Sequence, residues 1–298
     1  MLVTAAARRV DFASSCAPAV KPALNDGLAL LYAFEYQTAR AAFDGVIAAD
    51  FQCCIAYFFA ASSFSTPIWA YISDGDLARA HAYSVSATAC ARSAPAVTAR
   101  EAAYIAALAQ YANTSASLTP TARLRLYADA LNATVYTPYA VADEHASILY
   151  GLALLGVGYY SEAEPADGWP HLLEAARIEE AVLAPGRNPE APGALHYVVH
   201  SYDQPSLAVR ALGAARRFAA VAAEPIATLG GAVPTGWSKW PSWWCYGWPR
   251  SAPRAASGGP RLPSALGRRD PAPQIPPRAS RGPGASAAPK RRHDFRRV

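Results

Sequence analysis

The chain has 298 residues, of which 52% are hydrophobic and 16% charged, and its formal net charge is +5. The charge is unevenly distributed: residues 1–223 hold 14 Lys+Arg against 19 Asp+Glu, a net of −5, and residues 224–298 hold 13 against 3, a net of +10. No uninterrupted apolar run reaches the roughly 18 residues of a membrane-spanning helix, and the N-terminal stretch MLVTAAARRVDF lacks the apolar core of a secretory signal. We therefore expect a cytoplasmic protein, or a chain whose true start is missing.

Residues 25–51 predict a hairpin of two short helices. Leu24, Leu28 and Leu31 fall at i, i+4 and i+7, which gives the first helix one apolar stripe. Gly27 lies within that helix, where glycine costs up to about 1 kcal/mol relative to alanine, and so indicates that another helix approaches closely. The second helix repeats the three-and-four spacing at Tyr36, Ala39, Phe43, Val46 and Ile47. Since neither helix can bury its apolar face alone, the pair needs neighbours.

Further helices are predicted along the chain, with an irregular lead-in at 1–17 and an irregular insertion at 158–169. Thr98 and Glu101 form a capping box at the start of one helix, and Asp74 or Asp76 is expected to cap another. Pro67 should break the chain, with Ile68 and Trp69 filling the core beside it. The expected helices are 53–64, 74 to about 90, 98 to about 112, 119 to about 135, 142–157, 171–183, 194–202 and 207–222.

The five cysteines, at positions 16, 53, 54, 90 and 245, are odd in number and form no CxxC pair. Cys53 and Cys54 are adjacent and cannot easily bridge to each other. We therefore expect reduced, mostly buried thiols.

The segment 224–298 differs in character, because 13 prolines and 9 glycines oppose regular structure there. It is expected to be a largely disordered basic tail, or the product of an altered reading frame. Nucleic-acid binding is not expected outside its arginine clusters. The last helical repeat before it would be uncapped, and self-association through that repeat would then be favoured.

A family resemblance rests on these residues. A glycine in the first helix, Tyr-x-x-Ala-x-x-x-Phe in the second, and Asp50 at the exit resemble a tetratricopeptide repeat, although Phe51 stands where a typical repeat has proline. The stretches at 10–20, 65–70, 98–108 and 192–208 also resemble a mostly bacterial tetratricopeptide group with no assigned catalytic activity, over roughly residues 10–222. The resemblance implies an all-α fold: a right-handed solenoid of about five degenerate hairpins over 18–223, with a concave groove.

A histidine-bearing stretch is the strongest chemical signal. His196, His200 and Asp203 fall at i, i+4 and i+7 and share one helix face. Two imidazoles four residues apart can bind one metal ion with a carboxylate as a further ligand. The repeat register places them on the groove, together with His145 beside Glu144, so that His145, His196 and His200 form a candidate metal site. The HExxH pattern is absent, and the alternative is that these histidines hydrogen-bond between helices while Asp203 ends its helix.

The second signal is the groove itself. The repeat register gives it an apolar face at Leu28, Leu31 and Tyr32, and the net-negative core suits a basic partner. The Lys/Asn pattern that grips a peptide carboxylate in chaperone-binding relatives is missing. We therefore expect a scaffold that binds a protein or peptide in its groove, with no cofactor and no catalysis of its own. The alternative is a zinc-dependent enzyme, such as a hydrolase, built on His145, His196 and His200.

Overall fold

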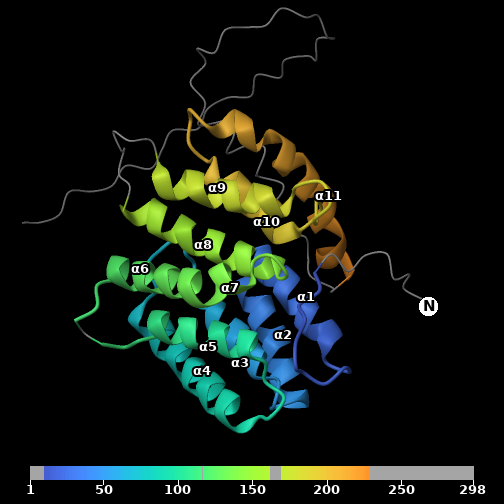
Figure 1. The fold of residues 1–298 in the computed structure, drawn as a ribbon, viewed down its shortest axis with the longest axis vertical. Helices are drawn as coiled ribbons and strands as arrows, with labels where there is room; N and C mark the ends of the chain where they lie inside the picture. The colour runs from blue at the N-terminus through green and yellow to red at the C-terminus, as the bar shows by residue number, and fades with distance from the viewer. Residues whose placement is uncertain (1–9, 116, 162–168, 229–298) are drawn as a thin grey trace, which may run out of the picture. The chain divides into compact units, whose positions relative to one another are not determined.

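The computed structural model describes residues 10–115, 117–161 and 169–228, and within these ranges every regular element is a helix. The all-α prediction is thereby confirmed (Figure 1). All described residues belong to one compact unit. The helices are α1 (Lys21–Tyr32), α2 (Tyr36–Ala49), α3 (Cys54–Ser62), α4 (Asp74–Ser93), α5 (Ala99–Tyr111), α6 (Pro120–Leu131), a π-helix (Asn132–Tyr136), α7 (Thr137–Tyr139), α8 (Glu144–Ser161), α9 (Pro170–Val182), α10 (Pro192–Ser201), a 3-10 helix (Ala208–Ala211) and α11 (Leu212–Thr228).

The N-terminal caps of α5 and α4 can be compared with the predicted ones. Thr98 and Glu101 make the predicted capping box, each side chain bonding the other residue's backbone N–H. At α4 the cap is Ser73, whose Oγ accepts a hydrogen bond from the Asp76 N–H at 3.1 Å. The prediction of an aspartate cap was wrong because Asp74 and Asp76 already lie in the first turn, where they complement the helix dipole.

Two helices extend further than expected. The helix predicted to stop near 157 continues to Ser161, and the last helix reaches Thr228, beyond the expected boundary at 223. Trp69 is 62% exposed, so the prediction that it fills the core was wrong, whereas Ile68 is buried. The expected irregular insertion at 162–168 and the expected tail from 229 onward lie outside the described residues.

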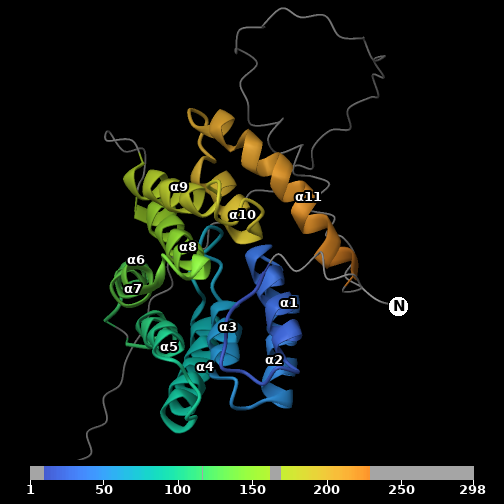
Figure 2. The ribbon, with the colours of Figure 1, turned by 45° about the vertical axis from the view of Figure 1, so that its right-hand side comes forward.

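Consecutive helices pack against one another from α1 to α6 and again from α8 to α11, with α6 packed on α8 (Figures 1 and 2). The α1–α2 pair explains Gly27. A Cβ on Gly27 would lie 2.7 Å from Cε1 of the Phe43 ring, so only glycine allows this approach. The predicted role of Gly27 as a site of close helix contact is confirmed.

Helix α1 also touches α10 and α11, so the first and last described helices are in contact. In an open repeat array each repeat touches only its neighbours, and this contact departs from that pattern. Tyr32, at the end of α1, is fully buried there, and so is Leu28 one turn earlier. These two residues belong to the core and do not form the apolar groove face expected for them.

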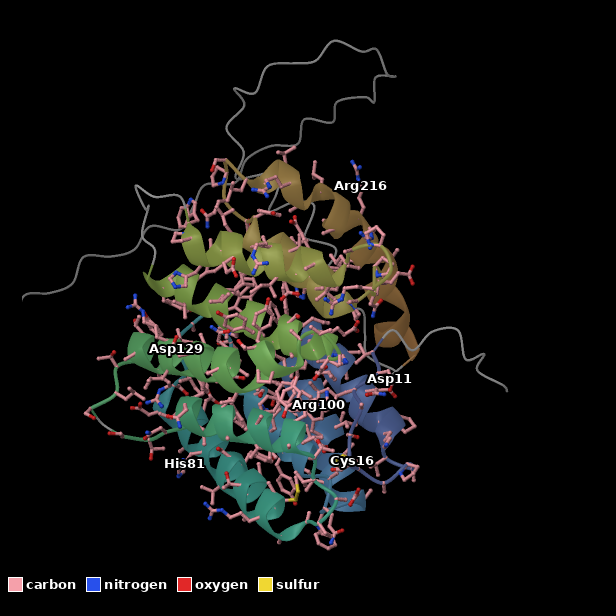
Figure 3. All side chains as sticks on the ribbon, viewed as in Figure 1. Asp11, Cys16, His81, Arg100, Asp129 and Arg216 are labelled. Carbon is pink, nitrogen blue, oxygen red and sulfur yellow. A yellow bond between two sulfur atoms is a disulfide. The ribbon has the colours of Figure 1, made fainter. Side chains whose placement is uncertain are left out.

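The N-terminal segment is more than a lead-in. Phe12 is 1% exposed, and its backbone N–H donates to Asn25 Oδ1 at 3.0 Å. The Arg100 guanidinium bonds both the Asp143 carboxylate and the Ala13 carbonyl, and so ties this segment to α5 (Figure 3). The segment therefore closes one end of the core.

Four cysteines form two disulfides: Cys16 with Cys53, Cα atoms 4.4 Å apart, and Cys54 with Cys90, 5.5 Å apart. The expectation of reduced thiols was wrong for these four, because adjacency prevents Cys53 and Cys54 from bridging to each other but lets each bridge outward. Cys245 lies outside the described residues. Disulfides persist in oxidising compartments and are rare in the cytosol. None of the helices in the described ranges has the length and apolarity needed to cross a bilayer.

Removing either bridge should destabilise the protein. The bridges span sequence separations of 37 and 36 residues, and closing loops of that size typically contributes about 2–4 kcal/mol each. Cys54→Ser/Cys90→Ser should therefore lower the free energy of unfolding in urea by about that amount. Thiol alkylation without reductant checks the pairing: labelling at all four positions in the native protein would contradict it.

Candidate functional site

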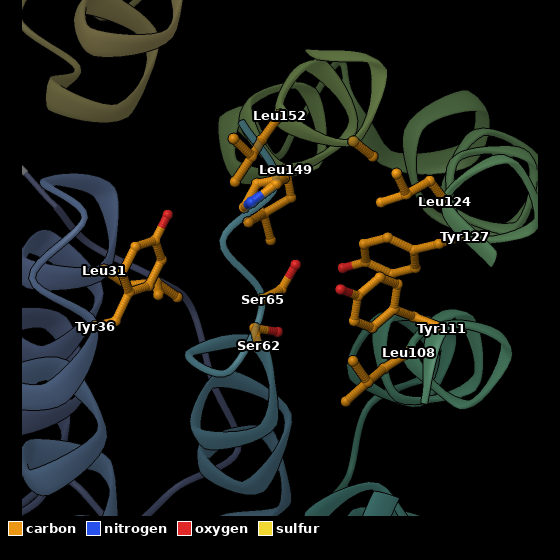
Figure 4. Close-up of a pocket in the computed structure, with 12 residues that line it drawn as sticks. Leu31, Tyr36, Ser62, Ser65, Leu108, Tyr111, Leu124, Tyr127, Leu149 and Leu152 are labelled. Carbon is orange, nitrogen blue, oxygen red and sulfur yellow. The ribbon is translucent and has the colours of Figure 1, made fainter. Parts of the chain in front are cut away.

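The described residues enclose a pocket with about 550 Å³ of empty space, a volume that includes its open mouth. It is built by α1, α2, α3, α5, α6 and α8 and by the loop after α3 (Figure 4). The lining residues are Leu31, Tyr36, Ser62, Ser65, Pro67, Leu108, Tyr111, Leu124, Tyr127, Leu149, Leu152 and Ala153. Apolar side chains with a few converging hydroxyl groups are the usual composition of a ligand pocket.

Tyr111 and Tyr127 point their hydroxyl groups toward the pocket floor, where Ser62 and Ser65 lie (Figure 4). Burial raises the pKa of Tyr111, and a hydrogen bond with the Ser65 side chain partly offsets that rise. Burial likewise raises the pKa of Tyr127, with Tyr111 adding to it and Ser62 opposing it. Both phenols are therefore neutral and remain hydrogen-bonding groups at physiological pH.

Several buried polar atoms have no hydrogen-bond partner among the described residues. They include the hydroxyl oxygen of Tyr36, which lines the pocket, and, away from its lining, the hydroxyl oxygens of Tyr160 and Tyr197 and both carboxyl oxygens of Glu179. Burial raises the pKa of Tyr36, and the nearby hydroxyls of Tyr111 and Tyr160 add to that rise. Buried polar groups in native proteins almost always have partners, so a group of unpartnered ones needs an explanation.

Glu179 is the least expected of these groups. It is fully buried on α9, facing α8, where a Cβ on Gly151 would lie 2.1 Å from its Oε1 atom. The arrangement parallels that of Gly27 and Phe43, with a carboxyl in the place of an aromatic ring. Burial raises the pKa of the Glu179 carboxyl well above its ordinary value, which favours the protonated form.

A second buried glutamate shows the contrast. Glu101 is also 0% exposed, but its carboxyl oxygens accept hydrogen bonds from the N–H and hydroxyl groups of both Ser15 and Thr98. That carboxyl ties the N-terminal segment to α5, an obvious structural role. Glu179 has no such set of donors among the described residues.

Aromatic side chains lie beside the pocket. Phe34, between α1 and α2, has φ of 63°, an unusual left-handed conformation for a residue with a side chain. Its ring stacks on that of Tyr36, with centroids 5.5 Å apart, and lies edge-on to Trp69 at 6.4 Å. Strained backbone of this kind is concentrated at functional sites.

The predicted histidine pair is present on α10, but both residues are buried in the core. His196 Nδ1 lies 2.6 Å from the Tyr32 carbonyl oxygen, so it carries the proton and donates. His196 Nε2 is then an acceptor, and His200 Nε2, 3.1 Å away, donates to it. Burial lowers the pKa of His196 to about 4, and burial, followed by the proximity of His196, lowers that of His200 further from its usual range. The pair is neutral and links α10 to α1.

His145 and Asp203 do not join this pair. His145 Nδ1 lies 2.8 Å from the Tyr32 hydroxyl and its Nε2 lies 3.2 Å from the Asp11 carbonyl oxygen, so both ring nitrogens are engaged. Asp203 is exposed beyond the end of α10. Across the described ranges, no group of three or more His, Cys, Asp or Glu side chains has an arrangement that could hold a metal ion.

The residues that line the pocket are therefore largely different from the candidate site residues that the sequence indicated. Of the seven candidates, only Leu31 lines the pocket, while Leu28, Tyr32 and the histidines 145, 196 and 200 are buried in the core. The tyrosines were missed because their spacing is that of ordinary core residues. Glu179 could have been found, since it falls in register with the apolar stripe of α9 at Leu172, Ala175, Ala176 and Val182.

No protein-family model matches this chain, and neither the curated proteins nor the solved structures contain a match to it.

Proposed function

We propose that the chain is an array of degenerate tetratricopeptide-like hairpins that binds a peptide or protein partner by taking one of its side chains into the pocket. The array would be the right-handed solenoid expected from the sequence, closed more tightly by the contact of α1 with α10 and α11. The repeated contact between a first-helix glycine and a second-helix side chain, at Gly27 and at Gly151, supports the hairpin unit.

The observation that carries the proposal is the Tyr36 hydroxyl. It lies in a pocket-lining residue, is buried, and has no hydrogen-bond partner among the described residues. An unpartnered buried hydroxyl typically costs about 1–3 kcal/mol, and a ligand group that bonds it recovers that cost. The apolar walls and the adjacent aromatic rings are typical of side-chain recognition.

A pocket-blocking substitution tests this function. Ser65 is half-buried on the pocket floor, and Ser65→Phe places a ring there. Peptides selected from a random phage-displayed library against the wild-type protein should bind Ser65→Phe at least about tenfold more weakly, a loss of one decade in Kd. Ser86→Phe is the matched control, because Ser86 is exposed on α4, and should leave Kd unchanged. Equal affinity of the selected peptides for the wild type and Ser65→Phe would contradict the proposal.

A further inference from the structure

We propose that Asn113 is an acceptor for N-linked glycosylation, and that Asn132, which begins the same sequence pattern, is not. The pattern is the Asn-x-Ser/Thr sequon, which occurs as NTS at 113–115 and as NAT at 132–134. A glycan on such an asparagine is bulky and needs a surface position. Neither sequon contributes a residue to the pocket lining, so this proposal and the proposed function can fail independently.

The first sequon lies in the loop between α5, which ends at Tyr111, and α6, which begins at Pro120. Asn113, Thr114 and Ser115 are all exposed. The Asn113 Oδ1 atom accepts a hydrogen bond from the Ser115 backbone N–H at 2.9 Å, which makes an Asx turn. This bond engages the amide oxygen, whereas the amide nitrogen is the atom that would receive the sugar.

The backbone of this loop is held from α6. The Arg123 guanidinium donates to the carbonyl oxygens of Tyr111, at 2.8 Å, and of Asn113. These contacts hold the loop by its carbonyl groups, while the Asn113 residue itself is exposed to solvent. A glycan attached to Asn113 Nδ2 would therefore extend from the surface.

The second sequon lies within helical backbone. Asn132 begins the π-helix that directly follows α6, and it is half-buried. The Thr134 hydroxyl donates to the Ala130 carbonyl oxygen at 2.8 Å, and Asn132 Oδ1 accepts a hydrogen bond from the Thr137 hydroxyl at 3.2 Å. A transferase would have to open this helical turn, with loss of its hydrogen bonds, to bind the sequon. The fold therefore distinguishes two sequons that the sequence presents alike.

The disulfides are an independent observation that agrees with a glycosylated chain. Disulfides form in the lumen of the endoplasmic reticulum and in secreted chains, and sequon glycans belong to secreted chains. Within the described residues, Cys16 is paired with Cys53 and Cys54 with Cys90.

The transfer step balances without an oxidant or a reductant. The Asn113 Nδ2 atom attacks the anomeric carbon of an oligosaccharide that is linked to a lipid through pyrophosphate. A carbon–nitrogen bond forms, and the carbon–oxygen bond to the pyrophosphate breaks. The lipid pyrophosphate leaves, and Nδ2 gives up one of its two protons to a base of the transferase.

Transfer to the folded chain tests the assignment. The full chain, with its disulfides formed, is incubated with a purified single-subunit oligosaccharyltransferase and a lipid-linked oligosaccharide, and mass spectrometry of proteolytic fragments measures the occupancy of each asparagine. Synthetic peptides of residues 110–118 and 129–137 present the same sequons without the fold, and the reaction is run under conditions that glycosylate both peptides. In the folded chain Asn113 should react at least about tenfold faster than Asn132, since Asn132 requires local opening of its helix.

Variants identify the acceptor. Asn113→Gln removes the sequon asparagine and Ser115→Ala removes the sequon hydroxyl, so both should lose the glycan, whereas Ser115→Thr should keep it. Asn132→Gln is the matched control and should leave the occupancy of Asn113 unchanged. A folded chain that stays unmodified at Asn113 while both peptides are glycosylated would overturn the proposal. Equal modification of Asn113 and Asn132 in the folded chain would also overturn it.

Discussion

Replacing Glu179 with methionine should make the protein more stable, by about 1–3 kcal/mol at neutral pH, since a buried polar group without partners costs that much. Methionine has a similar length and a flexible apolar chain, so it should fit the space beside Gly151. Urea unfolding followed by circular dichroism measures the change. Glu180→Met is the matched control: Glu180 is exposed and accepts a hydrogen bond from the Tyr202 hydroxyl, so this change should give no gain.

The gain should also depend on pH in a defined direction. The pKa of the Glu179 carboxyl is raised in the folded state, and in the unfolded chain it is about 4.3. Above about pH 4.3 the unfolded state loses its proton while the folded state keeps it, so wild-type stability falls as the pH rises toward the folded pKa. The advantage of Glu179→Met should therefore be smallest near pH 4 and grow toward neutrality. A variant less stable than the wild type, or an advantage independent of pH, would contradict this account of Glu179.

Tyr32→Ala should cause the largest loss of stability, about 3–5 kcal/mol, the usual range for removing a large buried aromatic side chain. Tyr32 is fully buried, its hydroxyl bonds His145, and its ring lies edge-on to Tyr197 with centroids 6.1 Å apart. The substitution removes packing at the contact that joins α1 to α8 and α10.

Tyr32→Phe separates packing from hydrogen bonding. It keeps the ring and leaves His145 Nδ1 without the hydroxyl, which should cost about 1–3 kcal/mol. Chemical denaturation of the two variants gives both values. If Tyr32→Ala costs less than about 1 kcal/mol, the contact between α1 and α10 does not hold the fold together.

Much of the fold could be predicted from the sequence because its determinants are local. The leucine spacing of α1, the small and bulky residues of α2 and the capping box at Thr98 each act within one helix or one hairpin. The disulfides could not be predicted in this way. Whether Cys53 and Cys54 bridge outward depends on where Cys16 and Cys90 lie after folding.

The candidate site was largely inaccessible to the same reasoning. Periodicity places Tyr36, Tyr127 and Tyr197 on buried faces but does not show which hydroxyls remain unpaired. Conversely, His196 and His200 have the i, i+4 spacing of a metal-ligand pair. In the structure their two rings hydrogen-bond to each other instead. Glu179 was the one detectable signal, a carboxyl within an apolar stripe.

The most direct test of the account is a crystal structure of the protein bound to the strongest peptide from the library selection. The account predicts that one side chain of the peptide is inserted into the pocket between Tyr36 and Tyr127. A peptide bound on another surface, with the pocket walls unchanged, would contradict it.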